Sequence, residues 1–203
     1  MLPSCPEDKY VNVGGVNTRY WLAGKQGNCI ILIHGLGASA EVWMYNISAL
    51  AKDHRVFVLD LPGFGRSEQP PPSFYPYDYV GFIEEFMDAL NIPQASLIGK
   101  SLGGGIAILY TLRYPQKVDK LILVDCAGFG KYVRWTLKLM SLPWIGELVT
   151  YPTRLGVSLF FKFAVRDSSV ITKEFIDIYY HCCPNVNRID SIGCWDGPPG
   201  LCR

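Results

Sequence analysis

The sequence has few histidines and no excess of either charge. Its 203 residues include only three histidines, and 19 basic side chains nearly balance 18 acidic ones. This balance gives no basic patch of the kind that binds nucleic acid. No run of eighteen apolar residues is present, so we expect no transmembrane helix. The first residues lack the basic and apolar segments of a secretory signal, and we therefore expect a cytoplasmic protein.

The cysteines do not have the spacing of a zinc site. The chain has seven of them, and the adjacent pair near the end is not a C-x-x-C pair. An odd number of cysteines without this spacing favours free thiols, and we expect no metal and no cofactor. Four cysteines lie close to the end of the chain, namely Cys182, Cys183, Cys194 and Cys202.

What the sequence does contain is an alternation of continuous apolar runs with helical patterns. A continuous apolar run is typical of a strand buried on both faces. We predict strands at residues 29–33, 55–59, 95–98 and 121–124, and helices at residues 42–51, 79–90 and 102–114. Residues 9–23 predict a β-hairpin, and Ser39 is a predicted helix cap. The alternation predicts an α/β fold with a mostly parallel, twisted sheet and helices on both faces.

Three loops leave the carboxyl ends of the first three predicted strands, the edge at which such sheets build their sites. The third loop contains the pattern G-x-S-x-G at residues 99–103. The predicted turn is tight, and Gly99 and Gly103 lack the side chains that would collide in it. Such a turn pushes the hydroxyl of Ser101 out of the chain. We therefore predict that Ser101 is a catalytic nucleophile.

The character of the sequence changes after residue 130. Aromatic and large apolar residues become frequent, prolines divide the segment, and no strand pattern is evident. We predict a core domain at residues 9–129, a helical cap at 130–184 and an irregular tail at 185–203. An apolar stretch at 155–165 is too short to span a bilayer, but contact with a membrane surface is an alternative.

Four motifs in this order resemble the α/β-hydrolase family, in its form with a helical cap. They are His-Gly-Leu-Gly at 34–37, Asp-Leu-Pro-Gly-Phe-Gly-Arg-Ser at 60–67, the serine motif at 99–103 and Leu-Val-Asp-Cys-Ala-Gly at 123–128. The resemblance covers roughly residues 9–181. It implies hydrolysis through an acyl-enzyme on Ser101.

The resemblance also implies an oxyanion hole and a substrate class. Its two backbone N–H donors would be those of Leu102 and Leu36, with Gly37 as the alternative to Leu36. The cap would roof a pocket for a small apolar acyl substrate. A serine at this position argues against the branches of the family that cut epoxides and haloalkanes, which have an aspartate there. Ester hydrolysis is the first expectation, and hydrolysis of carbon–carbon bonds in diketone-like compounds is the second.

The family implies a catalytic acid and a histidine on two further strands after the cap, and the sequence shows neither there. His34 is expected to be structural, and His54 lies before a strand, at the edge of the sheet opposite the site. His181 is the remaining histidine that could reach Ser101. Asp125 follows a strand on the site side and is the candidate acid. Asp60 is expected to brace its own turn.

These two observations together predict a shortened product of a longer hydrolase, with weak activity or none. The tail from about residue 188 is rich in Gly, Pro, Cys, Trp and Arg, as expected when G/C-rich DNA is read in a wrong frame. The alternative is a natural, non-catalytic relative that binds a ligand or partner. In both cases the strand at 121–124 would be an exposed sheet edge, which predicts low stability and self-association.

A nucleotide-binding loop is a further interpretation of Gly-Lys-Ser at residues 99–101. That loop needs a glycine five residues before Gly99, and Gln94 occupies the position. The intervening residues are a predicted strand, and the Asp-x-x-Gly at 60–63 precedes the supposed loop instead of following it. The sequence therefore argues against nucleotide binding.

Overall fold

The computed structural model describes residues 5–74 and 77–126, together with the positions 153–155, 158, 162, 171–173 and 176. The chain divides into two units, Met1–Gly130 and Lys131–Arg203, and every element below belongs to the first. Apart from those few positions, the predicted cap at 130–184 and the tail at 185–203 lie outside the described residues, and both stay predictions.

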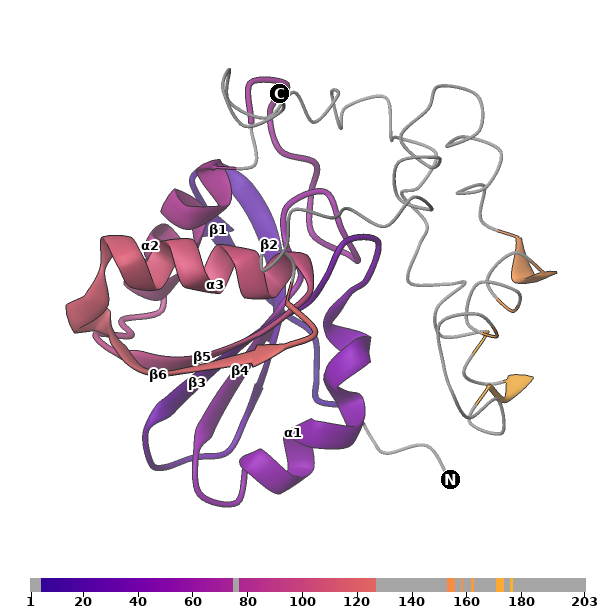
Figure 1. The fold of residues 1–203 in the computed structure, drawn as a ribbon, viewed down its shortest axis with the longest axis horizontal. Helices are drawn as coiled ribbons and strands as arrows, with labels where there is room; N and C mark the ends of the chain where they lie inside the picture. The colour runs from indigo at the N-terminus through magenta and orange to yellow at the C-terminus, as the bar shows by residue number, and fades with distance from the viewer. Residues whose placement is uncertain are drawn as a thin grey trace. The chain divides into compact units, whose positions relative to one another are not determined.

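The described unit is built on a six-stranded sheet in the order β1-β2-β4-β3-β5-β6 (Figure 1). β1 and β2 are antiparallel to their neighbours, and all other pairs are parallel. This confirms the predicted α/β class with a mostly parallel sheet. The strands are β1 Lys9–Val13, β2 Val16–Ala23, β3 Cys29–Ile33, β4 Arg55–Leu59, β5 Ala95–Lys100 and β6 Val118–Val124.

A tight turn joins β1 to β2, as the sequence predicts. Val13 pairs with Val16, and the two residues between them are Gly14 at φ 57° and Gly15 at φ 87°. A two-residue hairpin turn with positive φ at both positions matches the natural twist of the strands, and glycine adopts it without steric cost.

Helices cover both faces of the sheet. The 3-10 turn Ala40–Trp43 and α1, Met44–Leu50, pack on one face, whereas α2, Asp78–Ala89, and α3, Leu102–Arg113, pack on the other (Figure 1). Each central strand therefore buries both sets of its alternating side chains, which is why its sequence is continuously apolar.

The two faces have separate hydrophobic cores. Ile31 and Ile33 of β3 pack with the residues of α2 and α3, while Ile30 and Leu32 pack with the residues of the 3-10 turn and α1. These side chains are at most 5% exposed. Burying one of them fully contributes about 1.5–3 kcal/mol to the stability of the fold.

The start of the helix predicted at 42–51 differs from expectation. The chain first forms the 3-10 turn, and Ser39, at its N-cap, makes no capping hydrogen bond with its side chain. The carboxylate of Asp60 accepts the N–H of Ala40 instead, at 2.6 Å. A buried carboxylate from another loop has replaced the local hydroxyl, which a local sequence pattern does not reveal.

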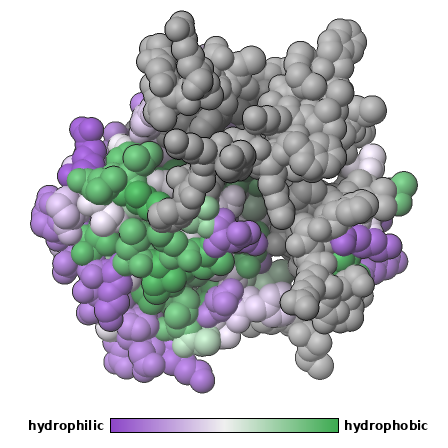
Figure 2. Space-filling view, in the orientation of Figure 1, coloured by the Kyte–Doolittle hydropathy of each residue, from purple (hydrophilic) through white to green (hydrophobic). Residues whose placement is uncertain are grey.

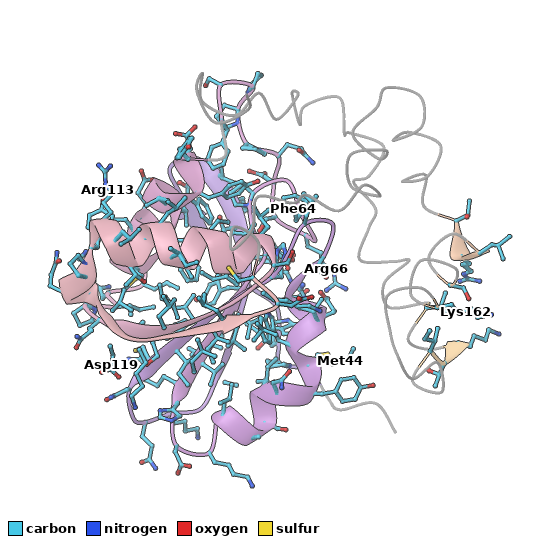
Figure 3. All side chains as sticks on the ribbon, viewed as in Figure 1. Met44, Phe64, Arg66, Arg113, Asp119 and Lys162 are labelled. Atoms are coloured by element: carbon cyan, nitrogen blue, oxygen red, sulfur yellow. The ribbon has the colours of Figure 1, made fainter. Side chains whose placement is uncertain are left out.

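The two ends of the sheet are distinct. Phe64 and Arg66 lie near the end at which α3 begins, and Arg113 and Asp119 lie near the opposite end (Figure 3). The loops after β3, β4 and β5 all belong to the first end, because parallel strands share their direction. In the described part of the chain, no helix is long and apolar enough to cross a membrane.

Candidate active site

Ser101 occupies a strained turn between β5 and α3. Its φ is 52° and its ψ is −116°, a conformation that residues other than glycine rarely adopt. Its N–H donates to the carbonyl of Val124 at 3.0 Å, and its own carbonyl accepts the N–H groups of Gly104 and Gly105. These bonds fix the turn at the carboxyl end of the sheet, with the side chain only half-buried.

The glycines that flank Ser101 have no room for a side chain. A Cβ at Gly99 would collide with the carbonyl of Gly103 and lie 2.6 Å from the Cα of Gly104. A Cβ at Gly103 would collide with the carbonyl of Ile33 and lie 2.5 Å from that of His34. The first turn of α3 therefore packs directly on β5 and on the end of β3, as the serine motif requires.

The loop at residues 34–39 lies beside Ser101. A Cβ added at Gly35 would lie 3.1 Å from the Cβ of Ser101 and 3.7 Å from its Oγ. Leu36 follows with an exposed side chain. On the other side, Leu102 is the first residue of α3, so its N–H has no acceptor in a preceding helical turn.

His34 is fully buried and uses both of its ring nitrogens. Nε2 accepts the N–H of Leu61 at 2.9 Å, which leaves Nδ1–H to donate to the carbonyl of Gly35 at 2.8 Å. Burial lowers the pKa of His34 and outweighs the nearby charge of Asp60. A neutral imidazole with both nitrogens occupied has no free lone pair for Ser101, so His34 is structural, as predicted.

Of the other candidates, His54 is not brought to Ser101, whereas Asp125 directly follows Val124, whose carbonyl accepts the N–H of Ser101. His54 precedes β4 and therefore lies at the amino end of the strands, as predicted. His181 lies outside the described residues. Asp125 follows β6 at the carboxyl edge, exposed and with φ 48°.

Asp60 braces the loops around the site, as predicted. It is fully buried, and its carboxylate accepts the N–H groups of Ala40 and Arg66 at 2.6 and 2.9 Å. It also accepts a bond from the guanidinium of Arg19 at 3.0 Å. One side chain thus ties together the loops after β3 and β4 and the middle of β2.

The sequence reasoning missed a buried ion cluster beside these loops. Arg19, in the middle of β2, is 1% exposed and contacts three carboxylates, those of Asp8, Glu41 and Asp60. Arg66 adds a second guanidinium, paired with Asp8. The available signal was the charged Arg19 directly before the aromatic residues Tyr20 and Trp21, within the predicted hairpin at 9–23.

Charges within the cluster stabilise one another. Burial opposes ionisation of Glu41, but the hydrogen bonds and charge of Arg19 hold its pKa below the ordinary value. Burial likewise opposes the charge of Arg19, and its bonds with Glu41 and the charge of Asp60 raise its pKa. Buried ions persist only when paired and hydrogen-bonded in this way.

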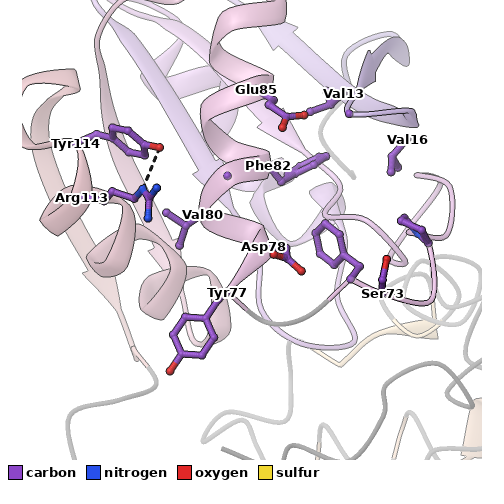
Figure 4. A pocket seen from close by; sticks show the side chains of 14 residues that line it. Val13, Val16, Ser73, Tyr77, Asp78, Val80, Phe82, Glu85, Arg113 and Tyr114 are labelled. Atoms are coloured by element: carbon purple, nitrogen blue, oxygen red, sulfur yellow. Dashed lines mark hydrogen bonds between the residues drawn. The ribbon is translucent and has the colours of Figure 1, made fainter. Parts of the chain in front are cut away.

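A cavity lies beside α2, away from Ser101. It has a volume of about 580 Å³ and is lined by apolar residues such as Val13, Phe74 and Phe82, with Glu85 and Arg113 at its margins (Figure 4). Neither Ser101 nor the loop at 34–39 contributes to it. Among the described residues, no group of His, Cys, Asp or Glu side chains could hold a metal ion.

Comparison with known proteins identifies the fold and several relatives. The family model described as alpha/beta hydrolase fold matches residues 28–141. A 2-hydroxy-6-oxo-6-(2'-aminophenyl)hexa-2,4-dienoic acid hydrolase of Metapseudomonas resinovorans is 36% identical over 178 residues, which cover 85% of this chain and 58% of that protein. The chain spans 24–58% of the length of such curated relatives.

Two solved structures agree with this result. The meta-cleavage product hydrolase of Pseudomonas fluorescens superposes with a TM-score of 0.77 at 31% identity, over 95% of this chain and 70% of that one. The naproxen esterase of Bacillus subtilis gives a TM-score of 0.75 at 20% identity, over 99% and 65%, and shares the fold. The sheet order, the serine turn and the family match all indicate the same conclusion: the chain belongs to the α/β-hydrolase family.

Proposed function

We propose that Ser101 is the nucleophile of an acyl hydrolase. The observation that carries the proposal is the positive φ of Ser101 at the strand-to-helix turn, beside the loop at residues 34–39. In the proposed reaction, Oγ attacks a carbonyl carbon, its proton passes through a solvent water to the leaving group, and the protonated leaving group departs from the tetrahedral intermediate. Water then hydrolyses the acyl-enzyme.

The proposed oxyanion hole uses the backbone N–H groups of Leu36 and Leu102, with Gly37 as the alternative to Leu36. Leu102 directly follows Ser101, and Leu36 directly follows Gly35, which lies beside the serine side chain. Each such donor typically contributes about 3 kcal/mol to stabilisation of the transition state. Gly99 and Gly103 serve by allowing α3 and β3 to approach the serine turn closely.

We expect this chain to hydrolyse its substrate only slowly. Serine is a poor nucleophile without a base, and neither described histidine is free at Ser101. His181 is the one histidine outside the described residues. Catalysis by binding and the oxyanion hole alone leaves a rate several orders of magnitude below that of a complete triad.

Esters of small apolar acids are the first proposed substrate class. Carbon–carbon bond hydrolysis of diketone-like compounds is the second, and it is favoured by two relatives above 30% identity whose names describe such hydrolases. Both reactions use a serine turn and an oxyanion hole, so only a comparison of turnover with the two kinds of substrate distinguishes them.

The test is covalent labelling followed by a comparison of substrates. We expect a fluorophosphonate to react slowly, because the serine lacks an available base, and to approach one adduct per chain only on long incubation. The adduct should be located on Ser101 by peptide mass spectrometry and be absent from Ser101→Ala. Hydrolysis of a short p-nitrophenyl ester should be slow and lost in the same variant. His181→Asn measures whether that histidine contributes at all.

Three outcomes would change the proposal. Faster turnover of a 6-aryl-2-hydroxy-6-oxohexa-2,4-dienoic acid than of the ester would favour the carbon–carbon reaction. A rate that depends on Ser101 and equals that of a complete serine hydrolase would contradict weak turnover. No adduct and no hydrolysis of either substrate would favour a non-catalytic, ligand- or partner-binding protein.

A further inference from the structure

The guanidinium of Arg19 is held from several directions at once. Its NH1 and NH2 groups donate to the two oxygens of Glu41 at 3.1 and 2.9 Å, and NH1 also donates to Asp60 at 3.0 Å. Nε donates to Asp8 at 2.8 Å, and the group stacks 4.5 Å from the ring of Trp21. A planar guanidinium with a bidentate partner has one orientation, so the Arg19 side chain holds its three carboxylate partners in defined positions.

The same contacts fix the far end of the loop at residues 34–39. Ala40, directly after the loop, donates its N–H to Asp60, and Glu41 is bound by Arg19. The near end of the loop is held by the two hydrogen bonds of His34. Inside the loop, Ala38 N–H donates to the carbonyl of Gly35 at 3.2 Å.

Hydrogen bonds of the backbone also join β2 to the loop after β4. Asp60 donates its N–H to the carbonyl of Arg19 at 3.0 Å, and Arg19 donates its N–H to the hydroxyl of Ser67 at 2.9 Å. That hydroxyl donates to the carbonyl of Asp60 at 2.8 Å. β2 and the loop after β4 thus form one unit, and the loop at 34–39 is attached to it through Glu41 and Ala40.

We propose that the buried pair of Arg19 and Glu41 positions the oxyanion loop, residues 34–39, against Ser101. Glu41 is the positioning residue, and it acts through the backbone of the loop without touching substrate. This inference rests on the proposed function, in which Leu36 N–H is an oxyanion donor. A donor displaced by about 1 Å loses most of its effect on the transition state, so weaker binding of Glu41 by Arg19 should slow the reaction.

The test compares Glu41→Gln with Tyr110→Phe. The glutamine keeps the size of the side chain but loses its charge and one of its two acceptor atoms. Tyr110 is a matched control, because it is also buried and hydrogen-bonds a carboxylate, that of Glu84, but lies in the interface of α2 and α3. Tyr110→Phe removes the hydrogen bonds of the hydroxyl to Glu84 and Met87, which lie outside the loop at 34–39, whereas Glu41→Gln weakens the bonds to Arg19 directly after that loop.

Two readouts are needed. The first is amide hydrogen exchange of Ala38 and Ala40, which we expect to be at least about 10-fold faster in Glu41→Gln than in the wild type, with α3 unchanged. The second is the rate of Ser101 labelling by a fluorophosphonate, which we expect to fall about 10-fold at unchanged final stoichiometry. The stoichiometry separates a slower site from a smaller folded fraction.

The outcomes are separable. If Glu41→Gln leaves loop exchange and labelling rate at wild-type values, the inference is wrong. Equal slowing of labelling by Tyr110→Phe would show a general loss of order and would also overturn it. If the wild type gives no adduct on Ser101, the proposed function fails, and loop exchange alone then supports or contradicts the positioning by Glu41.

Discussion

At the scale of single residues, Ser101 combines backbone strain with hydrogen bonds that hold its backbone on both sides. Its φ of 52° is sustained because its N–H and carbonyl are both hydrogen-bonded, to Val124 and to the first turn of α3. The surrounding glycines allow that turn to touch the backbone of β3 and β5. Strain of about 1–3 kcal/mol at one residue persists only when its surroundings define the geometry in this way.

The first prediction concerns two glycines in different surroundings. Gly103→Ala should lower the free energy of unfolding by about 1–3 kcal/mol and slow Ser101 labelling, because the new Cβ meets the carbonyls of Ile33 and His34. Gly81→Ala, in α2, meets nothing within 4 Å and should stabilise the protein by about 0.5–1 kcal/mol. Urea unfolding checks both, and destabilisation of equal size at the two sites would contradict the contact argument.

The residues of the serine turn could be predicted from sequence, whereas the ion cluster could not. Ser101 and its glycines lie within five consecutive positions, so a local pattern reveals them. Arg19, Glu41 and Asp60 come together only when β2, the 3-10 turn and the loop after β4 are folded. Nothing in the sequence around any one of them specifies its partner.

At the scale of secondary structure, the buried strands were the most predictable elements. β3 and β4 have the predicted bounds, because apolar side chains on both faces leave no other assignment. β6 begins at Val118 and not at 121, since the 3-10 turn Pro115–Lys117 leads directly into it. Its second and third residues, Asp119 and Lys120, are charged and exposed, so a search for apolar runs begins only after them.

Strand β6 also forms the last position of the described sheet, and its exposed residues include Ile122 and Val124. An apolar area is also visible on the face that carries α3, where Leu109 and Leu112 are exposed (Figure 2). A strand with apolar, exposed side chains at the edge of a sheet favours pairing with another chain.

The second prediction follows from this edge. Ile122→Lys should reduce self-association, because a lysine on an edge strand opposes pairing with a second copy. Ile122 is already 46% exposed, so the free energy of unfolding should change by less than about 0.5 kcal/mol. Sedimentation velocity over a range of concentrations measures the effect.

Tyr45→Lys is the matched control, since Tyr45 is an exposed aromatic on α1, outside the sheet. The two variants add the same charge to the protein. Equal reduction of self-association by both would indicate a general effect of charge, and the role of the β6 edge would then be wrong.

At the scale of the whole molecule, a nearly neutral chain contains a local excess of buried negative charge. The formal net charge is +1, yet the cluster around Arg19 brings together three carboxylates and two guanidiniums. Arg19 connects β2 with Asp8 before β1, with Glu41 in the 3-10 turn and with Asp60 after β4. Its ion pairs therefore affect the stability of the described fold as well as the position of one loop.

The last prediction is the pH dependence that this cluster imposes on stability. The pKa of Glu41 is held below its ordinary value near 4.5, because Arg19 outweighs the effect of burial. The unfolded chain therefore binds a proton at Glu41 at a higher pH than the folded one does. The stabilisation by Glu41 is fully present above pH 4.5 and is lost as the pH falls through the lowered folded-state pKa.

Glu41→Gln removes this titration and leaves Arg19 with a weaker partner. At pH 7 the variant should be less stable than the wild type by about 1–3 kcal/mol, and the difference should shrink towards zero as the pH falls below 4. Thermal unfolding followed by circular dichroism between pH 3 and 7 measures both proteins. A difference that stays constant over this range would show that size and packing, and not the charge of Glu41, determine its contribution to the fold.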